Sequence, residues 1–250
     1  MKMIFNGNLI DSMELQPGDW LSGKGVFETI RAEERQTFAL HRHYCRAKEA
    51  AVFNLPNEEV VTSAVNRLLT SNNYPISRLR ISFRNDGDWL ITNHEYLDPK
   101  PAKLMIFNEP NMDNELRIKS FPYDRNLALH QDANAAGFDD GILFTTYGEV
   151  AETAFANIAL EIDGEWLTPP LTAGILNGVM RAIAIEAKMI SVAPITRSQL
   201  ERASRGLLIS SLRIAQEIAE IDGRKLASAQ TKSAQIWKLI ESFQIGRAHV

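Results

Sequence analysis

The sequence predicts an α/β protein of the α+β type, built from two lobes that each contain a mixed sheet. Strand-like and helix-like patterns alternate along the chain, and the polar stretch "NEPNMDN" at 108–114 divides them into two series. With 250 residues, 45% of them hydrophobic and 23% charged, the chain is long enough for two modest domains. We expect an N-terminal lobe at 1–107, a linker at 108–113 and a C-terminal lobe at 114–250. A crevice between two such lobes is a common place for a cofactor.

The first lobe begins with a predicted hairpin, because Asn6-Gly7 is a dipeptide that tight hairpin turns favour. Of the two helices that follow, the first has an apolar stripe, and the second has Asn57 as its N-cap with acids in its first turn. The other expected elements are two strands around a polar turn at 25–40, helices at 41–55 and 57–73, and strands at 78–83, 89–92 and 103–108.

The second lobe alternates strands and helices in the same way. Gly137 is expected to end its first helix, and Asp163-Gly164 to form the tip of a hairpin. The expected elements are strands at 116–121 and 141–146, a hairpin at 155–169, a strand at 207–211, and helices at 125–137, 177–189 and 227–243.

Composition excludes several classes of protein. The net charge is −4 and there is no long basic run, so the sequence does not indicate a positively charged surface for binding nucleic acid. No apolar run approaches the roughly 20 residues that span a membrane, and the start of the chain is too short and polar for a secretory signal. Cys45 is the single cysteine, so no internal disulfide is possible, which fits a reducing cytoplasm.

Two residues suggest cofactor chemistry. Lys119 follows a strand-like stretch, and a lysine buried in a crevice becomes a nucleophilic amine that can form a Schiff base with an aldehyde. Glu152 lies in the mostly apolar stretch "GEVAETAFANIAL", where a buried acid needs a cation, and a pyridinium nitrogen is one suitable cation. Taken alone, each is more commonly a solvated surface residue.

Two further stretches are candidates for binding a phosphate. The loop in "LTAGILNGVMRAI" enters a helix, and the amide groups near Gly178 are placed as in anion sites at helix starts. The alternative is an ordinary helix start with Arg181 as a surface charge. Arg46 is a candidate for a bidentate phosphate clamp, and the alternative is a solvated basic helix face. A zinc site is disfavoured, since no acid or cysteine spacing completes a ligand set around His43.

Several motifs occur together in one order: "GKGVFETIR", "FALHRHYCRA", "IKS", "GFDDGILF", "GEVAETAFANI", "LTPPLTAGILNGVMR" and "LLISS". In this respect the chain resembles the class IV, fold-type IV pyridoxal-phosphate enzymes over nearly its whole length. That family includes branched-chain and D-amino-acid aminotransferases and aminodeoxychorismate lyases. The resemblance implies a two-lobed fold with pyridoxal 5′-phosphate in the crevice, and a homodimer.

The resemblance also implies roles for residues. Lys119 matches the lysine that carries the cofactor and later acts as general base, and Glu152 matches the partner of the protonated pyridine nitrogen. Asn157 matches a recurrent asparagine that supports the Glu152 strand. The residues expected around the cofactor phosphate and ring hydroxyl are Arg46, Val179, Met180, Ser211 and, with a one-residue offset from the family pattern, Tyr123.

The expected reaction is that of a lyase, which converts 4-amino-4-deoxychorismate to 4-aminobenzoate and pyruvate. The spacing from Lys119 to Glu152 resembles the lyases, and Met180 stands where transaminases of the class usually carry threonine. Arg84 and Phe27 are the expected substrate contacts, but the second arginine that lyases often carry after Arg84 is missing. The alternatives are an aminotransferase for D- or branched-chain amino acids, and a cofactor-binding protein that has lost turnover.

Overall fold

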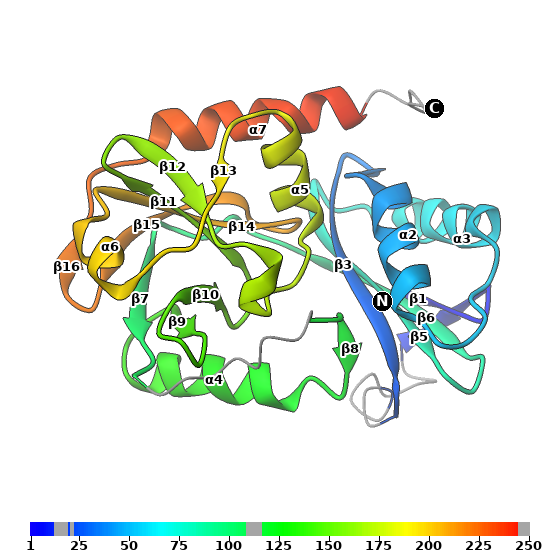
Figure 1. Cartoon of the computed structure of the whole chain (residues 1–250). Helices are drawn as coiled ribbons and strands as arrows, with labels where there is room; N and C mark the ends of the chain where they lie inside the picture. The colour runs from blue at the N-terminus through cyan, green and yellow to red at the C-terminus, as the bar shows by residue number, and fades with distance from the viewer. Residues whose placement is uncertain (13–19, 21–22, 109–116, 245–250) are drawn as a thin grey trace. The chain divides into compact units, whose positions relative to one another are not determined.

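Two compact units make up the part of the chain that the structure describes (Figure 1). This computed structural model describes residues 1–12, 20, 23–108 and 117–244, the last four of them by their backbone only. One unit contains Met1–Leu97 and Ile118–Tyr123, and the other contains Asp98–Arg117 and Asp124–Ser242. The chain therefore leaves the second unit after Arg117, contributes a short segment to the first, and returns at Asp124.

The first unit is built on a sheet of seven described strands in the order β2-β1-β6-β5-β3-β4, with β8 beside the start of β3. The strands are β1 (Lys2–Phe5), β2 (Asn8–Asp11), β3 (Gly25–Glu33), β4 (Gln36–Thr37), β5 (Ile76–Arg84), β6 (Trp89–Glu95) and β8 (Ser120–Phe121). The first hairpin is confirmed, with Asn6 and Gly7 both at positive φ as its turn requires. All described pairs are antiparallel, so the expected mixed sheet is wrong for this unit. Short reversals join β1 to β2, β3 to β4 and β5 to β6, and only antiparallel pairs allow such reversals.

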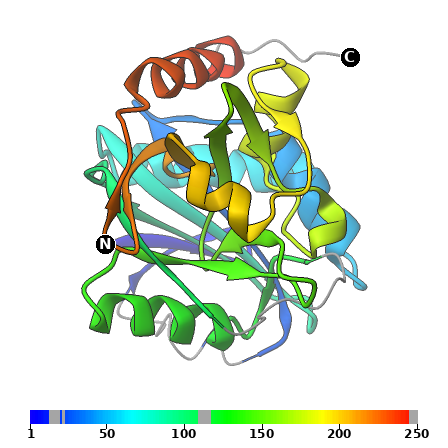
Figure 2. The same ribbon diagram turned by 60° about the vertical axis from the view of Figure 1, so that its left-hand side comes forward.

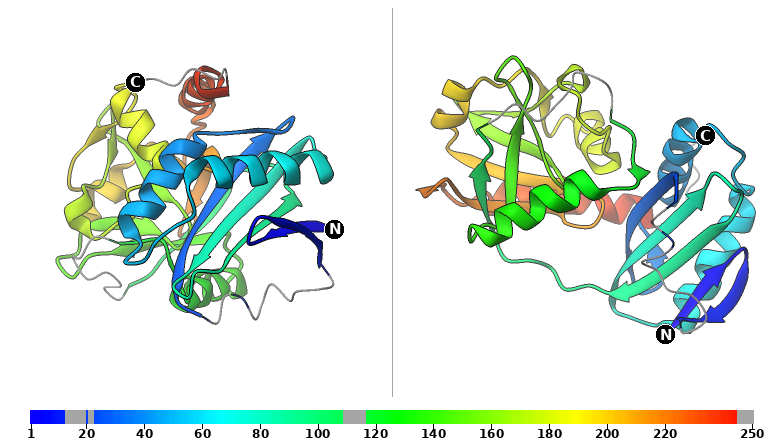
Figure 3. Two further views of the ribbon diagram at one scale, coloured as in Figure 1. Left: turned by 90° about the vertical axis from the view of Figure 1, so that its right-hand side faces the viewer. Right: turned by 90° about the horizontal axis from the view of Figure 1, so that it is seen from below.

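Helices α2 (Leu40–Ala50) and α3 (Glu58–Ser71) cover one face of this sheet (Figure 3). Their apolar sides pack on alternate residues of the strands, of which Leu79, Ile81 and Phe83 in β5 are examples. Asn57 precedes α3 as expected but makes no side-chain cap hydrogen bond. Because successive side chains of a strand point to opposite faces, Arg80 between Leu79 and Ile81 lies on the face away from the helices.

The second unit has a mixed sheet, as expected, in the order β10-β9-β7-β15-β14-β11-β12-β13 with β16 beside β15. β7 runs parallel to β9 and β15, and β12 parallel to β13. The strands are β7 (Ala102–Ile106), β9 (Asp140–Phe144), β10 (Val150–Thr153), β11 (Asn157–Ile162), β12 (Glu165–Thr168), β13 (Ser191–Val192), β14 (Arg205–Ser210), β15 (Ile214–Ile221) and β16 (Arg224–Lys225). The hairpin at Asp163-Gly164 is confirmed, with both residues at positive φ.

Helices α4 (Asp124–Ala135) and α7 (Gln230–Gln244) lie on opposite sides of the second unit's sheet (Figures 1 and 2). A short 3-10 helix, η2 (Leu171–Ala173), precedes α5 (Val179–Glu186), and α6 (Arg197–Arg202) follows. Gly137 has a φ of 87° just after α4, which confirms it as the residue that ends the helix. A core of branched aliphatic side chains from β7, β9, β11 and β14 holds the unit together.

The observed division differs from the expected one at two places. β7 pairs with β9 and β15, so it belongs to the second unit, although the expected boundary at 107 puts it in the first lobe. Apart from Asn108, the expected linker at 108–113 lies outside the described residues. In its described part, the strand expected at 116–121 is reduced to Ser120–Phe121. Arg117 forms a single bridge to Leu176 in the second unit, whereas β8 pairs with β3 in the first.

Candidate active site

The Glu152 carboxylate is buried, with 4% of the residue exposed, and accepts hydrogen bonds from two side chains and one backbone amide of the second unit. Arg117 Nη1 donates to Oε1 at 3.0 Å. Asn157 Nδ2 and the backbone amide of Leu176 donate to Oε2 at 2.9 and 3.1 Å. A charged donor and two neutral donors favour the ionised carboxylate. The prediction of a buried acid is therefore correct, but the sequence did not predict that Arg117 contacts it.

Local strand geometry aims the Glu152 side chain. The register between β10 and β9 shifts between Val150 and Thr153, and irregularities of this kind re-aim a side chain. Asp140, fully buried at the start of β9, accepts hydrogen bonds from the Thr153 hydroxyl at 3.0 Å and the Ala154 amide at 3.1 Å. Arg213 lies 3.5 Å from the same carboxylate. These contacts fix the end of β10 directly after Glu152.

Asn157 connects Glu152 to the start of α5. Its side-chain amide donates both to Glu152 and to the Leu176 carbonyl, the latter at 3.0 Å. A Cβ at Gly178 would lie 2.1 Å from Asn157 Oδ1, so only glycine lets the helix start approach this closely. The expected supporting role of Asn157 is consistent with these contacts.

The first amides of α5 form a candidate anion site. Gly178 is the N-cap, and within the described part of the chain the amides of Val179 and Met180 have no hydrogen-bond acceptor. Unpaired amides at a helix start, together with the helix dipole, bind anions such as phosphate. Ser211 is largely buried in the turn after β14, and its hydroxyl has no described partner.

Arg181 is not the surface charge that the alternative interpretation of this helix implied. The residue is 3% exposed, and its guanidinium donates to the Thr168 hydroxyl at 3.3 Å and the Pro169 carbonyl at 2.6 Å. Burial lowers the pKa of Arg181, and Glu152 opposes that shift. Arg181 therefore ties α5 to the end of β12 and adds positive charge near Glu152.

In the first unit, Lys119 and Tyr123 surround the ring of Phe27. Lys119 Nζ lies 4.7 Å from the centre of the Phe27 ring and 5.6 Å from that of Tyr123. The two rings meet edge to face with their centres 5.0 Å apart. The Phe27 amide donates to the Lys119 carbonyl at 2.9 Å, which fixes the lysine backbone beside β3. Three of the expected site residues are thus brought together.

Arg80 is a functional candidate that the sequence analysis missed. Its guanidinium carbon lies 4.8 Å from the centre of the Phe27 ring. Burial lowers the pKa of Arg80, with a smaller contribution from nearby Arg78, and Tyr123 opposes both. Arg80 has no ion-pair partner among the residues that the structure describes. Arg84, the expected substrate ligand, instead pairs with Asp86 at 2.8 Å and lies 5.1 Å from the Trp20 ring centre.

Arg46 has a protein carboxylate as its bidentate partner. Its Nε and Nη2 donate to Glu28 at 2.8 and 2.5 Å, and His43 Nδ1 lies 2.6 Å from the same carboxylate. Burial raises the pKa of Glu28, but the attraction of Arg46 and His43 outweighs it and lowers the pKa from 4.5 to about 2. The basic helix face is therefore partly buried around an acid from β3. Glu28 therefore binds the two guanidinium nitrogens of Arg46 that were expected to bind a phosphate.

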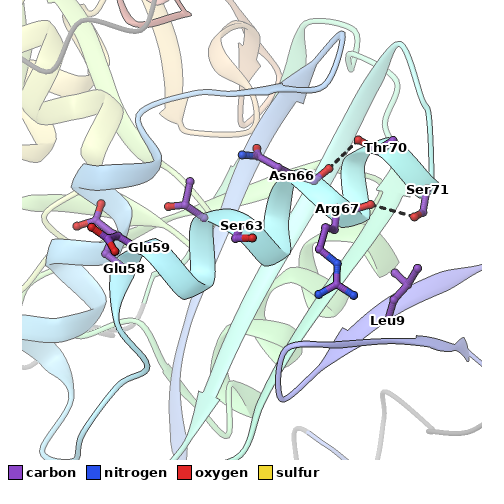
Figure 4. Close-up of a pocket in the computed structure, with 9 residues that line it drawn as sticks. Leu9, Glu58, Glu59, Ser63, Asn66, Arg67, Thr70 and Ser71 are labelled. Carbon is purple, nitrogen blue, oxygen red and sulfur yellow. Dashed lines mark hydrogen bonds between the residues drawn. The ribbon is translucent and has the colours of Figure 1, made fainter.

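A groove along the outer side of α3 contains none of these residues (Figure 4). The hydroxyls of Thr70 and Ser71 donate to backbone carbonyls one turn earlier, at 2.9 Å each, so the helix itself satisfies them. The groove is lined by Leu9, Glu58, Glu59, Thr62, Ser63, Asn66, Arg67, Thr70 and Ser71. Within the described ranges there is no group of three or more side chains suited to a metal ion, and no helix long and apolar enough to cross a membrane.

A family model described as class IV amino-transferase matches residues 25–221, which includes every strand and helix that carries the candidate residues. The chain belongs to the class IV aminotransferase family. This family depends on pyridoxal 5′-phosphate, so the protein is a pyridoxal-phosphate-dependent enzyme.

Relatives within the family carry two kinds of name. A protein of Methanocaldococcus jannaschii, provisionally named a branched-chain-amino-acid aminotransferase, is 26% identical over 92% of this chain and 91% of its own. The aminodeoxychorismate lyase of Bacillus subtilis is 27% identical over 72% of this chain and 71% of its own. The crystal structure of a branched-chain aminotransferase from Thermoproteus uzoniensis shares the fold, with a TM-score of 0.85, 22% identity, and coverage of 98% of this chain and 96% of that one.

The described residues fit the family's cofactor. Glu152 supplies a fixed, buried anion for a ring cation, and the α5 amides supply unpaired donors for a phosphate. Both features belong to the second unit and are linked through Asn157.

Replacing Gly178 with alanine should disconnect the two features. The φ of −66° at Gly178 permits alanine, so the cost comes from the contact with Asn157 Oδ1. We expect a loss of about 1–3 kcal/mol in the free energy of unfolding as the Asn157 hydrogen bonds break, measured by urea denaturation. In an Asn157→Ala background, Gly178→Ala should cost much less. An equal cost in both backgrounds would contradict this explanation.

The Glu28 cluster should make stability depend on acid pH. Since the folded-state pKa of Glu28 is about 2 and the unfolded value is 4.5, its contribution is present above pH 4.5 and is lost as the pH falls toward 2. The contribution is on the order of 3 kcal/mol. Urea unfolding between pH 7 and pH 3 should show a steeper loss of stability for the unaltered protein than for Glu28→Gln. The exposed Glu49→Gln variant serves as control and should keep the original slope.

Proposed function

We propose that the protein is a lyase that converts 4-amino-4-deoxychorismate to 4-aminobenzoate and pyruvate. The observation that carries this proposal is Arg80, a half-buried cation over the Phe27 ring with no described ion-pair partner. The substrate has two carboxylates, whereas a branched-chain amino acid has one carboxylate and an apolar side chain. Arg80, with Arg78 beside it on β5, supplies the positive charge that Arg84 lacks because of its pair with Asp86.

In this proposal Lys119 would hold the cofactor, and its amine would act as general base at the carbon that bears the substrate amine. When bound, pyridoxal phosphate supplies an electron sink through its protonated ring. The enolpyruvyl ether bond breaks, Lys119 returns the proton, and pyruvate and 4-aminobenzoate leave, so that no other reactant is needed. Glu152 holds the ring nitrogen.

The phosphate is held by the amides of Val179 and Met180, with Ser211 and the charge of Arg46. Tyr123 contacts the ring hydroxyl, and Phe27 and Arg80 contact the substrate.

The proposal includes a homodimer, which rests on the family resemblance. It also includes a cytoplasmic location, which rests on the single cysteine.

An aminotransferase is the second candidate, because the relative that covers 92% of this chain carries that name. The same residues would serve both reactions, but a transaminase would retain the amino group of its first substrate for transfer to a keto acid. A single amino acid without a keto acid would then convert the bound cofactor to its amine form, and a lyase would not do so.

Pyruvate release from freshly prepared aminodeoxychorismate tests the proposal. The unaltered enzyme should release pyruvate, and Lys119→Ala should lose the activity because the general base is absent. The exposed Lys225→Ala variant is the matched control and should retain it. No release from an enzyme that holds its cofactor would rule out the lyase, and conversion by a single amino acid would then favour the aminotransferase.

Arg80→Gln should raise KM for pyruvate release by about ten- to a hundredfold, the cost of one charge-assisted hydrogen bond to a carboxylate. Arg78→Gln, which removes a more exposed arginine from the same strand, should have a smaller effect. Steady-state kinetics with all three proteins provides the measurement. An unchanged KM in Arg80→Gln would show that Arg80 does not bind the substrate.

A further inference from the structure

No step of the proposed reaction uses the positive charge of Arg117. Its guanidinium contacts Glu152 Oε1 at 3.0 Å, with side-chain exposures of 18% for Arg117 and 5% for Glu152. Its backbone bridges to Leu176, whose amide is another donor to the same carboxylate. Arg117 is therefore an integral part of the Glu152 cluster and not a surface residue that happens to lie nearby.

Stability alone does not account for an arginine at this position. Removing two charges from water costs several kcal/mol per ion, and a buried ion pair often contributes little net stability. Glu152 already has two neutral donors, Asn157 and the Leu176 amide, that orient it. The property that Arg117 adds is its positive charge.

We propose that Arg117 is a positioning residue for a proton: it keeps the proton shared by Glu152 and the cofactor's ring nitrogen on the nitrogen. This inference rests on the proposed contact between Glu152 and that nitrogen. Because the guanidinium contacts the carboxylate directly, a proton that moves from the nitrogen to Glu152 moves toward Arg117. Coulomb repulsion opposes that movement, and it is strong where the site is shielded from water.

Arg181 is another cation that acts on Glu152 within the second unit. Arg181 in α5 is buried and within electrostatic range, but its printed hydrogen bonds go to Thr168 and the Pro169 carbonyl. Since Arg117 touches the carboxylate and Arg181 is bonded elsewhere, we assign the larger effect on the proton to Arg117.

The test is the ¹⁵N NMR signal of pyridoxal phosphate labelled at its ring nitrogen and bound to each protein. The unaltered protein and Arg117→Lys should both give a signal typical of pyridinium. Arg117→Met and Arg117→Gln should move the signal toward that of neutral pyridine. Arg202→Met is the matched control, because Arg202 pairs with Asp163 at the same 3.0 Å but with 52% of its side chain exposed. It should leave the signal unchanged.

The outcomes separate the inference from the proposed function. A pyridinium signal in Arg117→Met and Arg117→Gln would overturn the role of Arg117. If Glu152→Gln also left the signal unchanged, the proposed contact between Glu152 and the nitrogen would fail instead. Loss of cofactor binding in the Met and Gln variants but not in Arg117→Lys would support a role of charge. Loss in all three would show that Arg117 acts through packing, and would overturn the inference. None of these readouts depends on turnover.

Discussion

The buried carboxylate of Glu152 holds together three segments of the second unit. Its donors come from Arg117 before β8, from Asn157 at the start of β11, and from Leu176 in the loop before α5. An ionised carboxylate without these donors would be costly to bury, and the donors would otherwise lack an acceptor. The candidate ring-nitrogen partner and the candidate phosphate site are therefore consequences of the same hydrogen bonds. Asp140 fixes the end of the Glu152 strand from the other side.

The local part of this architecture was predictable from sequence. Turn dipeptides such as Asn6-Gly7 and Asp163-Gly164, and the glycine after α4, act through backbone preferences of a few adjacent residues, and all three are confirmed. Pairings between distant segments were not predictable in this way. The Arg117–Glu152 pair spans 35 residues, and no spacing rule connects them. The place of β7 depends on its pairing with β15, which the sequence analysis did not identify as a strand.

Arg80 is an intermediate case. In "RLRISFR" the arginines alternate with apolar residues, and the period of two puts them on one face of the strand. That alternation was available from the sequence and would have supplied the positive charge that Arg84 alone does not. The alternation does not predict that Arg80 lies over Phe27 or that Arg84 pairs with Asp86. The period of two predicts that one face of β5 is positively charged. Only the tertiary contacts show that Arg80 lacks an ion-pair partner among the described residues.

The short visit of Ile118–Tyr123 to the first unit has a consequence for how the gene can be divided. The backbone passes between the units after Leu97, after Arg117 and after Tyr123. No single uninterrupted gene fragment encodes either unit alone. A fragment that ends at Leu97 lacks β8 and Lys119, while one that begins at Asp98 carries both of them without their partner strand β3. Recombination between relatives is therefore expected to keep the segment from Phe27 to Lys119 as one block, since a crossover within it would separate these two residues.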